Sequence, residues 1–350
     1  MPGPPPFSLR RRLLSLPTLA SFVIAAVLLA VLASRFSIDV EKTWQTIRAS
    51  HLPLYLLALG VHYTTFLFRG ARWRLLLKNA GAEADSPLPS VGTAGRLILL
   101  GWFASSITWF RLGDVYRAYA YGEESGASLP RGVGTVLAER VMDVIVVFAL
   151  LLVGFLLLLA DPAHRPSGFL LVAGLGLIGA AGLFLLAMRL LRTPLAKRLP
   201  ARLRQHYWTF HQGTMRSFGS LPVVMTLGLL GWFSEVGRLF FVVQATGLPV
   251  GMGLILFVSM AHAFFSSVPL TPGGLGVAEA GMAGLLALAL RPEQALSVAL
   301  LDRSISYLST IFVGSIALLY HQRVVARRLW TGATLPATGA SATTSESPSP

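Results

Sequence analysis

Two arginines recur at a fixed distance after glycines in otherwise apolar sequence. Gly113 precedes Arg140 by 27 residues, and Gly276 precedes Arg303 by the same 27 residues. An arginine deep in an apolar helix is costly, so it usually faces the interior of a helix bundle and meets a partner or a ligand. The spacing therefore indicates two matched arginines that hold an internal carboxylate or an anionic ligand.

A cluster of helix-breaking residues precedes the second arginine. Proline lacks a backbone N–H and glycine lowers helix propensity, which excludes a continuous helix over Pro269, Pro272, Gly273, Gly274 and Gly276. Irregular backbone at membrane depth is tolerated where it lines a cavity or is packed in protein. The half-helix that begins near Gly276 exposes free N–H groups and a positive dipole end, which favour an anion such as phosphate. The alternative is a plain loop between two spans.

Acidic residues lie within reach of these positions. Asp143 follows Arg140 by three residues and shares its helix face. Gly113 is placed to open a similar half-helix, in which Asp114 and Arg117 are i,i+3 partners. The candidate substrate-binding residues are Asp114, Arg117, Arg140, Asp143, Gly273, Gly274, Gly276, Glu279, Asp302 and Arg303.

Internal salt bridges that hold the helices together are a second interpretation of the same charges. The two interpretations are compatible, because an arginine can bind a carboxylate until an anionic ligand displaces it. For Glu235 and Arg238, an i,i+3 pair in another apolar segment, we favour the structural role. We expect no metal and no cofactor, because His62 and His262 are isolated and no ligand spacing is present. Without a catalytic constellation, enzymatic activity is not expected either.

The composition places these residues in a membrane protein. Hydrophobic residues make up 54% of the chain and charged residues 13%, with a mean hydropathy of +0.66. Several apolar stretches reach the ~20 residues needed to cross a bilayer as helix. The formal charge of +14 lies mainly beside apolar spans, where cytoplasmic orientation and anionic lipid explain it better than nucleic acid does. The absence of cysteine excludes disulfides and thiolate metal sites.

The elements around the arginines form an internal repeat. We predict an all-α polytopic protein with about eight membrane segments, an inverted repeat and two broken helix hairpins. The predicted parts are a basic cytoplasmic N-terminus (1–15), a first span and outer linker (16–51), repeat 1 (52–160), a connecting span with a basic interfacial segment (161–220), repeat 2 (221–324) and a disordered tail (325–350).

Positive charges orient these segments. Basic residues cluster at 10–12, 69–78, 189–216 and 323–328, and the positive-inside rule assigns all four clusters to the cytoplasm. This holds if 88–129 enters the membrane from the cytoplasm and turns back, and if 249–290 does the same from outside. Both termini are then cytoplasmic, and 189–216 contacts anionic lipid headgroups. Eight ordinary spans that obey the charge rule poorly are the alternative.

The sequence from Val268 to Ala280, VPLTPGGLGVAEA, resembles the signature of the lysylphosphatidylglycerol synthase transmembrane, or flippase-like, family. Segments 68–73, 111–118, 139–143 and 302–303 follow in that family's order. The resemblance covers about residues 20–325 and implies a bacterial inner-membrane protein that moves phospholipid or lipid-linked material between leaflets. It implies no aminoacyl transferase activity here, because the chain has no room for the soluble domain of the fused members. Trp109-Phe110 stands where members often carry Pro-Gly, so we expect the first break to be gentler than the second.

These observations together predict a translocase for an anionic or zwitterionic lipid. We expect Arg140 and Arg303 to engage the headgroup phosphate, while Asp114, Glu279 and Asp302 hold those arginines or accept a cationic headgroup. The alternatives are a secondary transporter of a soluble anion, a membrane enzyme acting on a lipid headgroup, and a scaffold for envelope enzymes.

Overall fold

A computed structural model describes residues 40–84, 86–108, 112–159, 200–266 and 271–330, together with residue 186. The part of the chain described in this way is built from helices and turns, without a strand, which confirms the predicted all-α class. The first span, predicted within 16–51, and the connecting span, predicted within 161–220, lie largely outside these residues, because nothing before residue 40 and only residue 186 of 160–199 is described.

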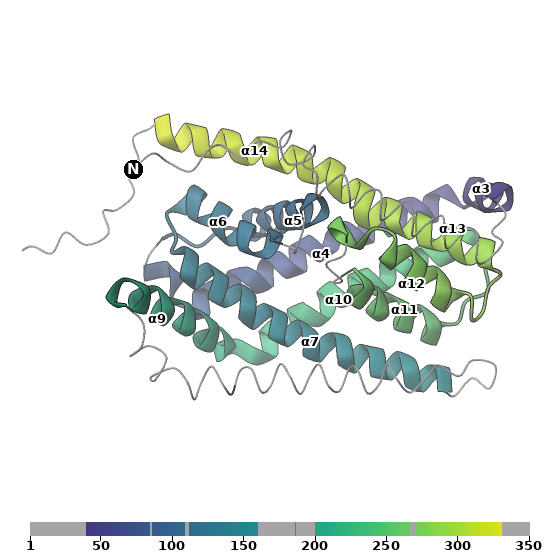
Figure 1. The fold of residues 1–350 in the computed structure, drawn as a ribbon, viewed down its shortest axis with the longest axis horizontal. Coiled ribbons are helices and arrows are strands. Elements are labelled where there is room, and N and C mark those ends of the chain that lie inside the picture. Colours follow the sequence, from purple (N-terminus) through teal and green to yellow (C-terminus); the bar gives the residue numbers. More distant parts are fainter. Residues whose placement is uncertain are drawn as a thin grey trace, which may run out of the picture.

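The helices follow the apolar runs closely, with proline in the first turn of several of them (Figure 1). They are α3 (Val40–Arg48), α4 (Leu52–Asn79), η1 (Ala82–Ala84), α5 (Val91–Ile107), α6 (Gly113–Ser125), α7 (Leu129–Leu159), α9 (Ala201–Arg216), η3 (Ser217–Ser220), α10 (Leu221–Thr246), α11 (Met252–Phe265), η4 (Pro272–Gly274), α12 (Val277–Leu286), α13 (Pro292–Arg303), the π-helix η5 (Ser304–Ser309) and α14 (Thr310–Trp330). We refer to α4–α7 as the first half and to α10–α14 as the second half.

Helices α4 and α10 run antiparallel along the centre of the molecule. The N–H of His51 donates to the carbonyl of Ala245 at 2.7 Å, and at the other end the Asn79 amide donates to the carbonyl of Ser217 at 3.2 Å. Between these ends, Gly231 lies against the Arg69 side chain. A Cβ added at Gly231 would lie only 3.3 Å from the arginine Cγ. Small residues of α10 therefore let the arginines of α4 enter the interface.

Each half contains a two-helix hairpin. In the first, α5 and α6 pack so closely that a Cβ on Gly113 would overlap the carbonyl oxygen of Gly101. In the second, α11 and α12 meet where a Cβ on Gly281 would lie 2.4 Å from the ring of Phe265. The backbone between α11 and α12 turns through positive φ, +61° at Gly273, a conformation that glycine adopts at little cost. Both hairpins therefore depend on glycine contacts.

The turns of the two hairpins meet inside the protein. The Tyr307 hydroxyl, on η5, donates to the carbonyl of Ser106 at the end of α5, at 3.0 Å. Gly273, in the other turn, packs against the same tyrosine ring and the Cα of Ser106. Helices α5 and α11 each pack on a helix of the opposite half. Phe103 of α5 packs on α14, and Phe257 of α11 packs on α7. The two halves thus interlock around the hairpin turns.

The open ends of the hairpins lie at opposite ends of the molecule (Figure 1). The open end of the α5–α6 hairpin lies beside the last turns of α14, where Arg328 donates to the carbonyl of Glu123 at 3.0 Å, at the end of the molecule that also carries α9. The α11–α12 end lies with the start of α13 at the end that carries α3. The exposed basic residues of α9 and α14 accordingly gather at one end of the bundle.

Several predicted boundaries differ from the structure. Helix α4 runs from Leu52 to Asn79 and contains the basic cluster 69–78, which is therefore not a purely external flank of a span. Helix α14 continues to Trp330, into the segment predicted as a disordered tail. Among the described residues, three helices, or four if the bent α3–α4 pair counts as one span, are long and apolar enough to cross a membrane. This indicates a helical membrane protein. The expected number of about eight membrane segments stays a prediction.

Candidate functional site

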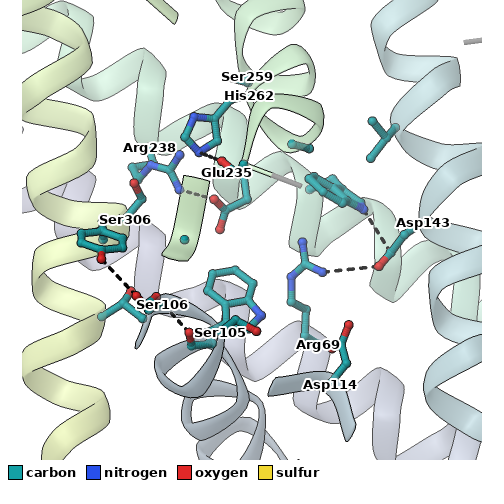
Figure 2. Close-up of a pocket in the computed structure, with 18 of the residues that line it drawn as sticks. Arg69, Ser105, Ser106, Asp114, Asp143, Glu235, Arg238, Ser259, His262 and Ser306 are labelled. Atoms are coloured by element: carbon teal, nitrogen blue, oxygen red, sulfur yellow. Dashed lines mark hydrogen bonds and ion pairs between the residues drawn. The ribbon is translucent and has the colours of Figure 1, made fainter. Parts of the chain in front are cut away.

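A cavity of about 440 Å³ lies where the two hairpin turns approach the central helices (Figure 2). Seven charged side chains line it: Arg69, Asp114, Arg140, Asp143, Glu235, Arg238 and Arg303. Indole, phenol and hydroxyl groups complete the wall, among them Trp102, Trp232, Tyr307, Ser105 and Ser306. Because buried charge is stable only when it is paired, the ion pairs of this cavity decide what it can bind.

Arg140 is the most exposed of the charged residues that form ion pairs at the cavity. Its side chain is 38% exposed, and it contacts Asp114 at 2.9 Å and Asp143 at 3.1 Å. The Asp143 contact confirms the predicted i,i+3 pair. Glu139, the residue directly before Arg140 in the sequence, also reaches the guanidinium, at 3.5 Å. Arg140 therefore has carboxylate partners and still faces the cavity.

Arg303 is held from behind by the first turn of α12. Its Nε donates to Glu279 Oε1 at 2.6 Å, and its Nη2 donates to the carbonyl of Gly273 at 3.0 Å. The other Glu279 oxygen accepts the N–H of Gly276 at 2.6 Å. That N–H was expected to be free for a phosphate, which is wrong, because the chain caps it with its own carboxylate.

Arg238 binds Asp302, one of the three carboxylates that were expected to hold Arg140 and Arg303 or to accept a cationic headgroup. Its guanidinium contacts Asp302 at 2.7 Å and also pairs with Glu235. Asp302 is 0% exposed and lies behind the cavity wall, so its expected role of holding Arg140 or Arg303 is wrong. The first half contains the matching contact, Arg72 to Glu139 at 3.0 Å.

The remaining predicted residues divide between the wall and the layer behind it. Of the ten candidates, five line the cavity, namely Asp114, Arg140, Asp143, Gly273 and Arg303. Glu279, Gly276 and Asp302 support the arginines as described above, and Gly274 is buried in the turn beside Ser266. Arg117 pairs with Asp114 at 3.5 Å, as predicted, and lies buried over the Trp73 ring with Glu139 at 3.2 Å. Arg117 is therefore part of the support and is not placed to touch a ligand in the cavity.

Arg69 was counted in a cytoplasmic basic flank and is instead a buried wall residue. Its side chain is 3% exposed, with Trp232 and Trp102 rings at 4.7 and 5.4 Å from the guanidinium carbon. Its nearest carboxylate oxygen among the described residues is Asp143 Oδ2, at 3.8 Å. One signal marks it in the sequence: Arg69 precedes Arg72 by three residues, as Glu235 precedes Arg238.

The sequence analysis described His62 and His262 as isolated, but in the structure both lie against other polar side chains. His62 lies within 3.3 Å of Arg238 and 3.5 Å of Glu235. His262 lines the cavity and contacts the Ser266 hydroxyl at 2.8 Å. Within the described residues, no group of three or more histidine, aspartate or glutamate side chains is placed to hold a metal ion.

Known proteins are similar to this chain over most of its length. The family described as lysylphosphatidylglycerol synthase TM region matches residues 18–314. A UPF0104 membrane protein of Methanocaldococcus jannaschii is 30% identical over 217 residues, covering 61% of this chain and 92% of that protein. UPF0104 membrane proteins of Pyrococcus horikoshii and Methanothermobacter thermautotrophicus are each 23% identical, over 82% and 84% of this chain and 92% and 91% of their own lengths. All three relatives are described as membrane proteins, in agreement with the apolar helices.

Proposed function

The chain belongs to the family of the lysylphosphatidylglycerol synthase TM region, and from this premise we propose that it moves a phospholipid or lipid-linked molecule between membrane leaflets. The observation that carries the proposal is the cavity with seven charged side chains, placed between the turns of two hairpins. A polar group that crosses a bilayer needs such a site, because hydrocarbon offers no hydrogen bonds. Binding and movement account for the site without a chemical step.

The proposal includes two re-entrant hairpins that approach the cavity from opposite leaflets. In support, α4 and α10 are antiparallel, and the α5–α6 and α11–α12 hairpins open at opposite ends of the bundle (Figure 1). Arg72–Glu139 in one half and Arg238–Asp302 in the other are matching ion pairs. An inverted repeat of this kind lets one midplane site open alternately to each side.

The orientation follows from the exposed basic residues. Arg204 and Arg216 on α9, and Arg323 and Arg327 on α14, are exposed at the end where the α5–α6 hairpin opens. We place that end, where α14 reaches Trp330, on the cytoplasmic side of a cell membrane. Helix α9 then lies at the leaflet surface, where its arginines attract anionic headgroups.

Leaflet exchange in proteoliposomes tests the proposal. A labelled anionic phospholipid should exchange faster with the wild-type protein than in empty vesicles, and Arg140→Gln should reduce that rate about tenfold, since the ligand loses a charged contact. Arg96→Gln is the matched control, because Arg96 also pairs with a carboxylate, Glu124 at 2.6 Å, but at the open end of a hairpin and outside the cavity.

Each result has a defined meaning. Loss of exchange in Arg140→Gln alone, with an unchanged thermal unfolding transition, supports movement of lipid through the cavity. Equal losses in both variants contradict a role for the cavity. Wild-type vesicles that exchange no lipid but take up a labelled soluble organic phosphate would replace lipid movement with transport of a soluble anion.

A further inference from the structure

The two sides of the cavity carry opposite formal charge. On the first-half side, four arginines (Arg69, Arg72, Arg117 and Arg140) face three carboxylates (Asp114, Glu139 and Asp143), an excess of one positive charge. On the second-half side, Arg238 and Arg303 face Glu235, Glu279 and Asp302, an excess of one negative charge with histidines counted as neutral. Together the described ions of the cavity and its supports are neutral, so the site is a dipole.

The positive excess is concentrated at Arg69. The other arginines of the wall have a carboxylate oxygen within hydrogen-bond distance: Arg140 at 2.9 Å, Arg238 at 2.7 Å and Arg303 at 2.6 Å. Arg69 has Asp143 at 3.8 Å, and that carboxylate is already bound by Arg72 at 2.7 Å and by the Trp232 indole at 3.1 Å. A buried guanidinium flanked by two indole rings gains cation–π attraction but no full countercharge.

The negative excess is concentrated at Glu235. One of its oxygens binds Arg238, while Oε1 is buried and has no hydrogen-bond partner among the described residues, its neighbour being His62 Nδ1 at 3.5 Å. Arg238 is satisfied separately, because Asp302 contacts it at 2.7 and 3.2 Å. A buried carboxylate oxygen without a donor costs free energy. Glu235 is therefore placed to accept a cation from the cavity.

Arg69 and Glu235 are equivalent positions with opposite charge. Each lies one helical turn before the arginine that pairs with the deep acid of its half, Arg72 or Arg238. In Figure 2 they face the space between them, Arg69 with Asp143 on one side and Glu235 with Arg238 on the other. Two matched positions thus supply the two unsatisfied charges of the wall.

We propose that the cavity binds a zwitterion, a phosphate ester carrying an ammonium group, with the phosphate on Arg69 and the ammonium on Glu235. A guanidinium forms paired hydrogen bonds with phosphate, and a carboxylate accepts hydrogen bonds from an ammonium. This charge pattern occurs in a phosphatidylethanolamine headgroup and in soluble phosphoethanolamine. The inference rests on the proposed function only where it names a lipid as the ligand. The zwitterion site itself does not depend on that function, because soluble phosphoethanolamine carries the same charge pattern.

The test compares two lipids and two variants in the same vesicles. Labelled phosphatidylethanolamine should exchange faster than labelled phosphatidylglycerol with the wild-type protein, because the latter lacks the ammonium group. Glu235→Gln should lower this preference about tenfold, mainly by slowing phosphatidylethanolamine. Arg69→Gln should slow both lipids, and Arg69→Lys should restore part of the rate, because it restores the charge.

Both variants are expected to remain folded, because other ion pairs of the cavity remain in place. Glu235→Gln leaves Arg238 bound to Asp302, and Arg69→Gln leaves Asp143 bound to Arg72, so in both variants the remaining buried charge keeps a partner of opposite sign. Thermal unfolding measured in detergent should change little in both. A changed rate of lipid exchange with an unchanged thermal unfolding transition supports the assignment. The assignment is overturned if Glu235→Gln does not alter the lipid preference, or if the wild-type protein prefers phosphatidylglycerol.

A second arm separates this inference from the proposed function. If wild-type vesicles exchange neither lipid, calorimetry in detergent compares soluble phosphoethanolamine with glycerol phosphate. Tighter binding of phosphoethanolamine that is lost in Glu235→Gln and Arg69→Gln retains the zwitterion site and rejects lipid movement. Equal binding of the two compounds, or binding of neither, rejects the zwitterion site as well.

Discussion

Replacing Glu279 by glutamine should destabilise the protein more than the same replacement of an exposed glutamate would. The Glu279 carboxylate joins Arg303 and the N–H of Gly276, each at 2.6 Å, and only 4% of its side chain is exposed. Glutamine keeps the volume and one acceptor oxygen but leaves the Arg303 guanidinium without its carboxylate. Breaking a buried ion pair from one side costs about 3–5 kcal/mol. Loss of the charged cap of α12 acts in the same direction, about 1 kcal/mol.

The assay is equilibrium unfolding in mixed micelles, followed by tryptophan fluorescence. The free energy of unfolding of Glu279→Gln should fall by about 3–5 kcal/mol. Glu41→Gln is the matched control, because Glu41 also lies in the first turn of a helix, α3, but is exposed. Its effect should remain below about 1 kcal/mol.

A double mutant shows whether the pair acts as a unit. Arg303→Gln removes the charge that Glu279→Gln leaves uncompensated, so the double variant should be less destabilised than the sum of the single changes. A loss below about 1 kcal/mol in Glu279→Gln, or strict additivity in the double variant, would refute the reasoning. Arg303 would then be stabilised by other contacts.

Three further predictions concern the hairpins. Gly113→Ala should lower the free energy of unfolding by about 1–3 kcal/mol, because the new Cβ would overlap the Gly101 carbonyl; thermal or chemical unfolding measures this. Tyr307→Phe should cost about 0.5–1.5 kcal/mol, because it removes the 3.0 Å hydrogen bond by which η5 holds the end of α5 at Ser106; the same unfolding assay applies. A single cysteine at Ser125, in a chain without cysteine, should react with an impermeant maleimide from the cytoplasmic side only.

Two of these predictions, Gly113→Ala and the cysteine at Ser125, have a control in the chain. Gly284→Ala places a methyl group in open space on α12, so it should not destabilise, and a loss equal to that of Gly113→Ala would contradict the steric argument. Ala49→Cys, exposed near the end of α3, should be labelled from the opposite side to Ser125→Cys. Labelling of both cysteines from one side would exclude the proposed orientation of the hairpins.

Local sequence signals predicted the helices and the second break well. Proline in a helix interior and several glycines close together both disfavour a continuous helix, so the turn at Gly273 and Gly276 could be predicted without tertiary information. The i,i+3 contact of Arg140 and Asp143 follows from helical geometry alone, and the structure has it at 3.1 Å.

Partners distant in sequence could not be predicted in this way. Asp302 binds Arg238, 64 residues away, because α10 and α13 pack together, and no local spacing encodes that contact. Arg69 was misassigned because charges end an apolar stretch in hydropathy, whereas α4 continues as helix to Asn79. A charge at a span boundary and a charge in a cavity look the same until the length of the helix is known.

The distribution of the ion pairs bears on how the chain is assembled and how it moves. Among the described residues, every contact between an arginine and a carboxylate side chain joins two residues of the same half, as Arg72 with Glu139 and Arg303 with Glu279 do. Contacts between the halves include uncharged hydrogen bonds, such as Tyr63 to Ser309 at 3.0 Å. During synthesis, the first half can therefore neutralise its carboxylates before the second half emerges from the ribosome. In the finished protein, a shift of one half against the other would separate no guanidinium from its carboxylate, and would act instead on contacts such as those of His321 with Glu124, at 2.6 Å, and of the Trp232 indole with Asp143, at 3.1 Å.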